Sequence, residues 1–373
     1  MKPSPSSTLA VIGAGTMGAG IAQVALEAGW RVRLHDANPL GLDAGRRRIE
    51  AGLARRATKL GLVADAAADW VAARLEALQP ASTSLGAAAG ADLVIEAIVE
   101  ELAAKRELFE ALDAACPGDT ILATNTSALS VTAIAAAAVR HPERVVGLHF
   151  FNPAPVLRLV EVVPGAATDP AIEAQATRVV GSWGKTAVRS TDTPGFIVNR
   201  VNRPFTIEAL RLIEAGVATV TEVDAAIRAD GFSMGPFELM DLVGIDVNLA
   251  AAQGVWEGLG RPERLRPSPI QASLVAAGRL GRKSGSGFYA YRDGGAPVME
   301  PLPEAIVPVP GRAAIAPGDI VGRIRGAIAD EAVIVRDAGV ASEADIDTAL
   351  RLGAAHPEGP FAWLGDHGRA SVG

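Results

Sequence analysis

Short apolar runs alternate with stretches of helical periodicity over the first half of the chain. Each run spans four to seven residues, which fits a buried strand, and most are followed by apolar positions at helical spacing. The runs lie at residues 9–12, 31–35, 91–96, 120–123, 145–149, 157–163 and 186–190. Strands that alternate with helices are typical of a doubly wound α/β sheet. We predict such a sheet, as an N-terminal domain, over residues 1–191.

Residues 40–78 depart from this alternation, because two helical segments stand where one crossover helix is expected. The first segment is strongly basic and carries a single acid among its cations, Glu50. Its cations are Arg46, Arg47, Arg48, Arg55, Arg56 and Lys59. Four of them, Arg48, Arg55, Arg56 and Lys59, share one helical face. Two interpretations stay open: a site for a polyanionic tail such as a phosphorylated nucleotide, and a solvated cationic face.

From Phe196 onward the pattern is helical almost throughout and contains a repeat. Residues 208–224 match residues 331–347 at a constant offset of 123, and the stretch between the copies is rich in proline and glycine. We therefore predict an all-α C-terminal domain with an internal repeat, whose two copies pack on each other. The predicted boundaries are 192–292 for the first copy, 293–317 for the linker and 318–373 for a short second copy.

Composition narrows the class of protein. Hydrophobic residues make up 49% of the chain and charged residues 21%, which is globular composition. The net charge of -7 gives no global reason to expect nucleic acid as a partner. No apolar run approaches the ~20 residues that cross a bilayer, the start lacks the apolar core of a signal peptide, and the single cysteine excludes an internal disulfide. We expect a cytoplasmic protein without membrane contact.

A glycine-rich turn follows the first predicted strand and opens a helix. In this GxGxxG pattern the first glycine permits a tight turn, the second lets a pyrophosphate approach, and the third lets helix and strand pack closely. The turn comprises Gly13, Gly15, Thr16, Met17 and Gly18. The next strand ends at Asp36, whose carboxylate can accept hydrogen bonds from a ribose 2′-OH and would repel a 2′-phosphate. The sequence thus predicts a Rossmann-type domain that binds NAD in preference to NADP.

Polar residues end two later strands, at the sheet edge where open α/β proteins bind ligands. Ser127 follows the strand at 120–123, where it could contact a ligand or cap the next helix. Glu100 and Lys105 flank the start of the preceding helix, as site residues or as a surface pair of modest worth.

His149 ends an apolar run, and Glu161 lies within the next one after a turn. A strand and a return segment could bring imidazole and carboxylate together, which would fix the ring tautomer and stabilise its protonated form, as a general base requires. A core histidine satisfied by a nearby acid is the alternative. Asn199 lies at the start of a long apolar helix, where a buried amide needs partners.

With these residues assembled, the chain resembles the 3-hydroxyacyl-CoA dehydrogenase family over residues 9–292, and its repeat is similar to that of members with a duplicated C-terminal domain. The resemblance rests on GAGTMGAGIAQ, VIEAIVEELAAKRELF, TNTSALS, GLHFFNPAPVLRLVEVV, DTPGFIVNR, GPFELMDLVG and GRKSGSGFY, in that order. It implies NAD-dependent oxidation of an (S)-3-hydroxyacyl-CoA to the 3-oxoacyl-CoA.

The resemblance also implies roles for individual residues. His149 would remove the 3-hydroxyl proton while Glu161 orients its ring, and Ser127 and Asn199 would bind the substrate oxygens. The residues lining the cofactor site would be Asp36 at the adenosine ribose, with Glu100, Lys105, Ser127, Asn152 and Lys283. Lys59, with Arg56 beside it, would contact coenzyme A, whereas Gly52 replaces a serine that contacts coenzyme A in a relative.

Other functions stay open at this point. A dehydrogenase of a free hydroxy acid, of the carnitine or gulonate type, would share the glycine turn and the His–Glu pair. A non-catalytic NAD-binding protein related to crystallins is a second alternative. The sequence offers no ligand cluster for a metal. Because the C-terminal domain forms the dimer interface in relatives with one copy, we expect a monomer in which the second copy replaces the partner, or else a homodimer.

Overall fold

The computed structural model describes residues 7–291, 298–299 and 315–366. The chain forms two compact units, residues 1–193 and 194–373. The predicted linker at 293–317 lies mostly outside the described residues, although 298–299 form a short strand.

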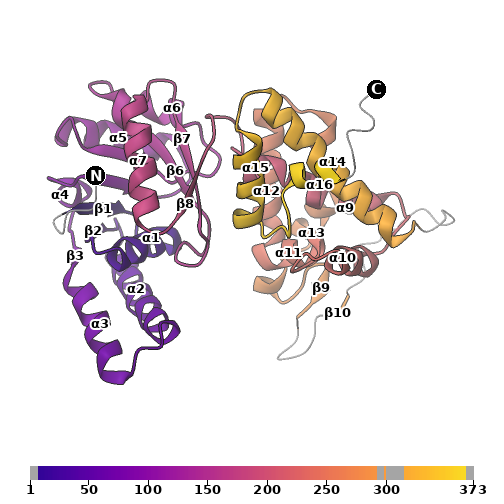
Figure 1. The fold of residues 1–373 in the computed structure, drawn as a ribbon, viewed down its shortest axis with the longest axis horizontal. Helices are drawn as coiled ribbons and strands as arrows, with labels where there is room; N and C mark the ends of the chain where they lie inside the picture. The colour runs from indigo at the N-terminus through magenta and orange to yellow at the C-terminus, as the bar shows by residue number, and fades with distance from the viewer. Residues whose placement is uncertain (1–6, 292–297, 300–314, 367–373) are drawn as a thin grey trace. The chain divides into compact units, whose positions relative to one another are not determined.

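The N-terminal unit is built on one eight-stranded sheet with the strand order β3-β2-β1-β4-β5-β6-β7-β8 (Figure 1). The strands are β1 (Thr8–Ile12), β2 (Arg31–His35), β3 (Leu78–Pro80), β4 (Leu93–Glu96), β5 (Ile121–Thr124), β6 (Val145–Phe150), β7 (Leu159–Pro164) and β8 (Thr186–Arg189). The first six strands run parallel, whereas β7 is antiparallel to β6, and β8 is parallel to β7. The predicted doubly wound α/β fold is confirmed.

Helices cover both faces of this sheet, because its strands are apolar on both sides. One hydrophobic core joins the sheet to α1 (Thr16–Glu27) and α7 (Pro170–Ser182). The other core joins it to α4 (Ser84–Ala88), α5 (Leu102–Ala115) and α6 (Val131–Ala135). Each fully buried Leu, Ile, Val or Phe stabilises the fold by about 1.5–3 kcal/mol relative to exposure. A 3₁₀ turn, η1 (Pro142–Arg144), precedes β6.

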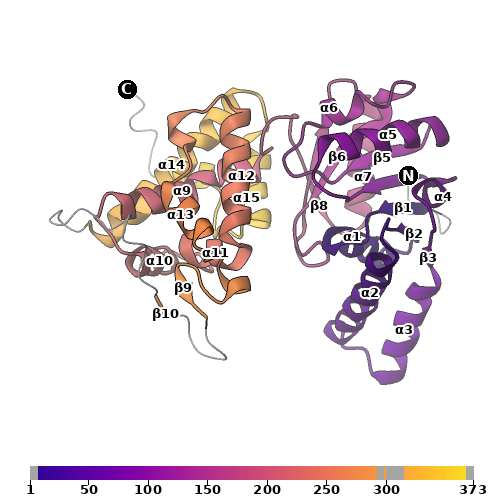
Figure 2. The same ribbon diagram turned by 180° about the vertical axis from the view of Figure 1, so that it is seen from behind.

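The two helical segments predicted after β2 are α2 (Pro39–Lys59) and α3 (Ala64–Glu76). Helix α2 packs on α1 through small and apolar residues, among them Ile49 and Leu53. Helix α3 buries none of its residues, and the two helices form a hairpin that projects from the sheet (Figure 2). Their polar sequence leaves one long face of α2 outside the core.

The C-terminal unit is helical. Its helices are α8 (Val198–Val201), α9 (Arg203–Glu214), α10 (Val220–Ala229), α11 (Pro236–Val243), α12 (Ile245–Gly258), α13 (Pro269–Ala276), α14 (Pro317–Asp337), α15 (Glu343–Gly353) and α16 (Pro360–Asp366). Two 3₁₀ turns, η2 (Glu263–Leu265) and η3 (Arg282–Ser284), and the strands β9 (Tyr289–Ala290) and β10 (Val298–Met299) complete it. The long helix expected to begin around Asn199 is instead two helices, because α8 ends at Val201 and α9 begins at Arg203. Pro204 cannot donate a backbone hydrogen bond and therefore sits in the first turn of a new helix.

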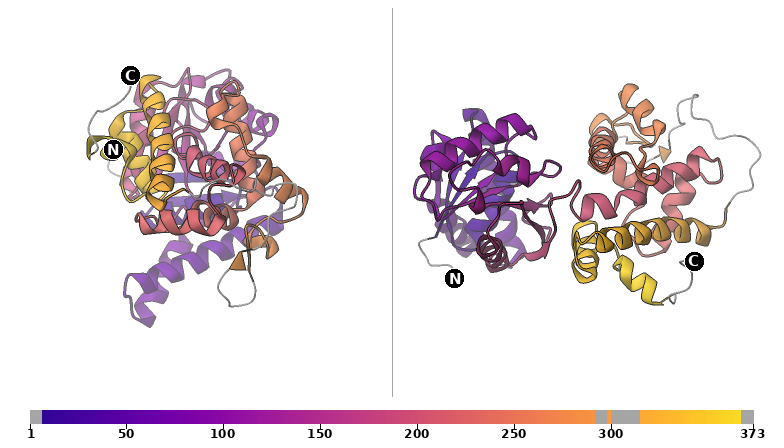
Figure 3. Two further views of the ribbon diagram at one scale, coloured as in Figure 1. Left: turned by 90° about the vertical axis from the view of Figure 1, so that its right-hand side faces the viewer. Right: turned by 90° about the horizontal axis from the view of Figure 1, so that it is seen from above.

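The two copies of the repeat pack against each other, as predicted. Helix α14 of the second copy lies along α8, α9 and α10 of the first, and Figure 3 shows it in gold beside them. Arg200 bonds Glu331 at 2.8 Å, and Arg323 bonds Glu208 at 2.9 Å. Because the same offset of 123 relates both arginines and both glutamates, the contact is reciprocal, as across the two-fold axis of a dimer.

Candidate functional site

His149 and Glu161 meet across the hairpin that ends the parallel sheet. They are directly opposed in the β6–β7 register, so their side chains leave the same face. The imidazole Nδ1 lies 2.6 Å from a carboxylate oxygen of Glu161, and the residues are 4% and 0% exposed. This contact holds the proton on Nδ1 and makes Nε2 the accepting atom. The arrangement can take up a proton from a hydroxyl and stabilise the resulting imidazolium.

Ser127 lies in the loop after β5, and Glu100 fixes that loop. One carboxylate oxygen of Glu100 accepts from the Thr126 hydroxyl at 2.6 Å and from the Ser127 and Ala128 amides at 2.8 and 3.1 Å. Burial acts to raise the pKa of Glu100, but the Thr126 hydroxyl, Lys105 and the Ser127 amide outweigh it and leave the pKa below its ordinary value.

Two of the alternatives considered from the sequence are wrong. The N-cap of α6 is Ser130, not Ser127, and Ser130 accepts from Ala133 N. Glu100 and Lys105 are not a surface pair, because Lys105 is only 1% exposed and contacts Glu96 as well as Glu100. The cap depends on the residue at which α6 begins, and the burial of Lys105 depends on contacts made only in the folded chain.

The glycine turn is shaped for a ligand that approaches the backbone. Gly13 has φ +102°, and a Cβ there would collide with the Ala97 carbonyl at the end of β4, whereas a Cβ on Gly15 would meet open space. Asp36 accepts from the Ala14 and Asn38 amides at 2.8 and 2.9 Å, which fixes its carboxylate beside the turn. The order of the sheet reverses between β1 and β4, and dinucleotides bind at such a point. These residues fit a dinucleotide.

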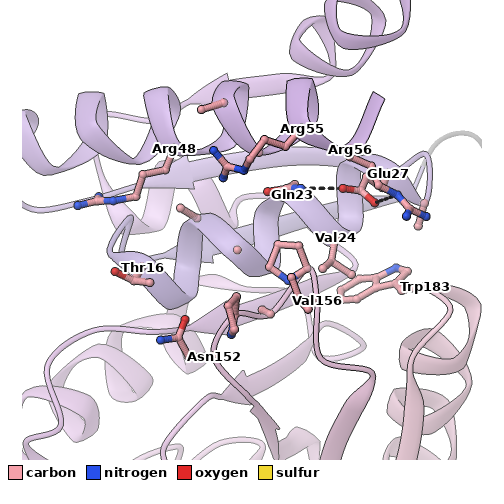
Figure 4. A pocket seen from close by; sticks show the side chains of 18 of the residues that line it. Thr16, Gln23, Val24, Glu27, Arg48, Arg55, Arg56, Asn152, Val156 and Trp183 are labelled. Carbon is pink, nitrogen blue, oxygen red and sulfur yellow. Dashed lines mark hydrogen bonds and ion pairs between the residues drawn. The ribbon is translucent and has the colours of Figure 1, made fainter. Parts of the chain in front are cut away.

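A large cavity lies beside this turn, between α1, α2 and the loop from β6 to β7 (Figure 4). Its volume is about 1260 Å³. The basic face of α2 forms one wall, and the cations that line the cavity are Arg47, Arg48, Arg55, Arg56, Lys59, Arg158 and Lys185. Glu27 is the acid among the lining residues, and it contacts Arg56 at 3.4 Å. The cationic face therefore borders a cavity of nucleotide size.

Several cavity residues escaped the sequence analysis. Lys185 donates to the carbonyls of Ala154 and Leu157 and so holds the β6–β7 loop. Its burial lowers its pKa to about 8. Arg158 and Trp183 also line the cavity. Arg158 lies within a quoted motif but was not singled out, and Trp183 and Lys185 lie outside the motifs. The end of α7 reaches the loop only in the folded chain.

Gly52 of α2 packs closely against the side chain of Gln23 on α1. A Cβ at this position would collide with the side chain of Gln23, which is 6% exposed and donates to Glu27 at 2.8 Å. Gln23 thus occupies the space in which a serine side chain would lie.

The other predicted site residues belong to the C-terminal unit. Asn199 lies on α8, next to the buried Arg200. Lys283 lies in η3 and pairs with Asp246 at 2.6 Å. Asp246, whose pKa is lowered chiefly by its hydrogen bond from Lys283, was not singled out in the sequence.

Two searches of the described part of the chain were negative. No group of three or more His, Cys, Asp or Glu residues is placed there to hold a metal ion. None of the helices in residues 7–291 and 315–366 is long and apolar enough to cross a membrane.

Comparison with known proteins adds the family. Residues 8–193 match the family described as 3-hydroxyacyl-CoA dehydrogenase, NAD binding domain, and residues 195–291 and 318–370 match the corresponding C-terminal domain. A 3-hydroxyadipyl-CoA dehydrogenase of Escherichia coli is 40% identical over 95% of this chain and 90% of its own length. A probable 3-hydroxybutyryl-CoA dehydrogenase of Bacillus subtilis is 44% identical over 76% of this chain and 96% of its own.

A solved structure extends the likeness to three dimensions. The crystal structure of a 3-hydroxybutyryl-CoA dehydrogenase from Escherichia coli K12 has a TM-score of 0.86 and 39% identity, covering 97% of this chain and 92% of the other. The matched segments include the NAD-binding unit and both copies of the helical repeat. The chain therefore belongs to the 3-hydroxyacyl-CoA dehydrogenase family.

Proposed function

We propose that the protein catalyses the reversible, NAD-dependent oxidation of an (S)-3-hydroxyacyl-CoA to the 3-oxoacyl-CoA. The observation that carries the proposal is the buried His149–Glu161 pair, 2.6 Å apart, on the sheet of an NAD-binding domain. The cation-lined cavity in that domain and the names of the relatives support a coenzyme A thioester as the substrate.

The mechanism assigns one step to each group. His149 accepts the proton of the 3-hydroxyl, and Glu161 stabilises the imidazolium that forms. Bound NAD supplies the hydride acceptor for the hydrogen on C3. Ser127 and Asn199 hydrogen-bond the oxygen as it changes from hydroxyl to carbonyl, which holds C3 in the geometry for transfer. General-base assistance of this kind contributes about 10²–10⁴ in rate.

The binding roles divide between the turn and the cavity. Asp36 would hold the adenosine ribose of NAD, Glu100 and Asn152 would border its nicotinamide half, and Lys283 would also bind the cofactor. Arg56 and Lys59, on the cavity wall, would bind phosphates of coenzyme A. Arginine and lysine suit this role because they pair with phosphate oxygens.

The two copies of the helical repeat suggest a role for the second. We infer that residues 318–373 take the place that a partner subunit's helical domain would occupy, so that the enzyme is a monomer. The reciprocal Arg200–Glu331 and Arg323–Glu208 pairs support this inference.

NADH oxidation with acetoacetyl-CoA and with free acetoacetate, side by side, tests the function. We expect oxidation with the thioester alone, because the cavity cations then have a ligand. Turnover of the free acid would favour a hydroxy-acid dehydrogenase instead. Turnover of neither substrate would favour a non-catalytic protein or another substrate.

The variant His149→Gln tests the assigned base. We expect turnover to fall by about 10²–10⁴, because the amide cannot accept the proton. NADH binding, followed by its fluorescence, should be nearly unchanged, since the imidazole acts on the substrate. A parallel loss of binding and turnover would argue that His149 is a core residue.

A further inference from the structure

Glu96, at the end of β4, is a charged residue with no exposed surface. One carboxylate oxygen contacts the Lys105 ammonium at 2.5 Å and accepts from Ile98 N at 2.8 Å. The other accepts from the Thr124 hydroxyl at 2.7 Å. Desolvating two charges offsets much of what their pairing gains, so a buried ion pair is a weak source of stability. The contacts of this pair point to another role.

Two chains of contacts lead from Glu96 to the Ser127 loop. The first runs through Lys105, whose ammonium lies 3.2 Å from the second oxygen of Glu100. The first oxygen of Glu100 accepts from the Ser127 and Ala128 amides. The second chain runs through Thr124, whose hydroxyl donates to Glu96 and accepts from Thr126 N at 3.3 Å. Both chains end in the loop that carries Ser127.

We propose that Glu96 is a positioning residue, which holds Ser127 in place through Lys105, Glu100 and Thr124. Glu96 directs the ammonium of Lys105, and Lys105 in turn directs the carboxylate of Glu100 toward the loop amides. Neutralising Glu96 frees Lys105 to move toward Glu100, which turns that carboxylate away from Ser127 N. The consequence for catalysis rests on the proposed function, whereas the consequence for the loop does not.

A second buried ion pair in the same unit provides a matched control. Arg144 and Asp113 lie 2.9 Å apart, and their side chains are 0% and 3% exposed, compared with 1% and 0% for Lys105 and Glu96. Asp113 also accepts from Arg140 N at 2.7 Å. These contacts lead to the segment before β6 and not to the Ser127 loop. Asp113→Asn therefore perturbs a buried pair without perturbing that loop.

Amide hydrogen exchange of the full chain, read by mass spectrometry on the peptide around residues 125–129, tests the positioning directly. In Glu96→Gln we expect the Ser127 and Ala128 amides to exchange about tenfold faster than in the wild type, because Glu100 no longer holds them. In Asp113→Asn they should exchange at the wild-type rate. Equal exchange in the wild type and Glu96→Gln, or equal acceleration in both variants, would overturn the proposal.

Kinetics with acetoacetyl-CoA add the functional half. Glu96→Gln should lower kcat roughly 10- to 100-fold with little change in the KM for NADH, since misplacement of a substrate-binding group by about 1 Å has such effects. Asp113→Asn should keep the wild-type kcat. An inactive wild type would remove the proposed function but leave the exchange comparison decisive. Should Glu96→Gln not fold, Thr124→Val replaces it, with faster exchange supporting the proposal and unchanged exchange overturning it.

Discussion

The two copies of the helical repeat share three helices, α9 to α11 in the first and α14 to α16 in the second. They differ in the elements that pack on these helices. In both, an aspartate on one helix caps the start of the next helix: Asp224 of α10 accepts from Phe237 N of α11 at 3.0 Å, and Asp347 of α15 accepts from Phe361 N of α16 at 2.9 Å. The first copy continues into α12, η2 and α13. The second has no counterpart of these elements among the described residues up to 366.

The corresponding helices α9 and α14 differ in the burial of one face. In the first copy Arg203 and Ile207 are buried, and Ile207 packs on Val255 of α12 and Leu265 of η2. The counterparts at the offset of 123 are Gly326 and Asp330, which are exposed and line a cleft of about 360 Å³. The arginine and the glutamate that join the two copies are the same in both. The residues that α12 and η2 cover in the first copy are different in the second. The comparison teaches that the second copy has kept the half that packs on the first and nothing of its predicted site, since Asn199 corresponds to Gly322.

The largest expected effect concerns the two pairing glutamates. Glu331 is 1% exposed and binds the buried Arg200, so Glu331→Ala leaves a buried cation unpaired and should cost about 3–5 kcal/mol. Its counterpart Glu208 binds Arg211 and Arg323, which are 25% and 42% exposed, so Glu208→Ala should cost only about 1 kcal/mol. Urea unfolding measures both.

Sedimentation of the same variants tests the role of the second copy. The wild type should sediment as a single 38.3 kDa chain. A wild-type dimer would contradict the picture of a repeat that replaces a partner subunit. Equal destabilisation by the two substitutions would contradict the contrast in burial between the two ion pairs.

A smaller effect is expected when Asn199 and its counterpart Gly322 are each replaced by alanine and activity is compared. Asn199→Ala should lower kcat/KM with acetoacetyl-CoA by about 10²-fold, as expected for loss of a donor to a developing oxyanion. The counterpart Gly322→Ala should leave activity unchanged, because a Cβ there meets no atom within 4 Å. It should stabilise the helix by about 0.5–1 kcal/mol. Comparable activities for Asn199→Ala and the wild type would remove Asn199 from the site.

The smallest expected effect is the pH dependence of the two capping aspartates. Burial raises the pKa of Asp224 to about 7, and burial also raises the pKa of Asp347. Because the folded state then binds more protons than the unfolded state, the contribution of Asp224 is greatest below about pH 4 and is lost as pH rises through 7. Asp224→Asn should flatten this decline by on the order of 1 kcal/mol.

The control for this pH effect is Asp347→Asn, which should flatten the decline less. Urea midpoints measured at several pH values give both slopes. If the slope of Asp224→Asn equals that of the wild type, the pKa of Asp224 is not raised by folding.

The sequence by itself determined the order of the elements and the chemistry at their ends. Apolar runs and helical spacing located the strands and helices, because burial periodicity is a local property of the chain. The glycine turn with Asp36, the opposition of His149 and Glu161, and the repeat were also readable, since each depends on residue types at fixed spacings. The family motifs added the expected activity.

The tertiary structure alone decided which polar groups meet. The burial of Lys105, its contact with Glu96 and the support of Ser127 by Glu100 join the ends of β4 and β5 through the start of α5. The cavity cations Arg158 and Lys185 join the basic helix only because the β6–β7 loop and the end of α7 fold onto α1. Contacts between residues far apart in sequence depend on packing, which no local pattern encodes, and these contacts decided the inner structure of the site.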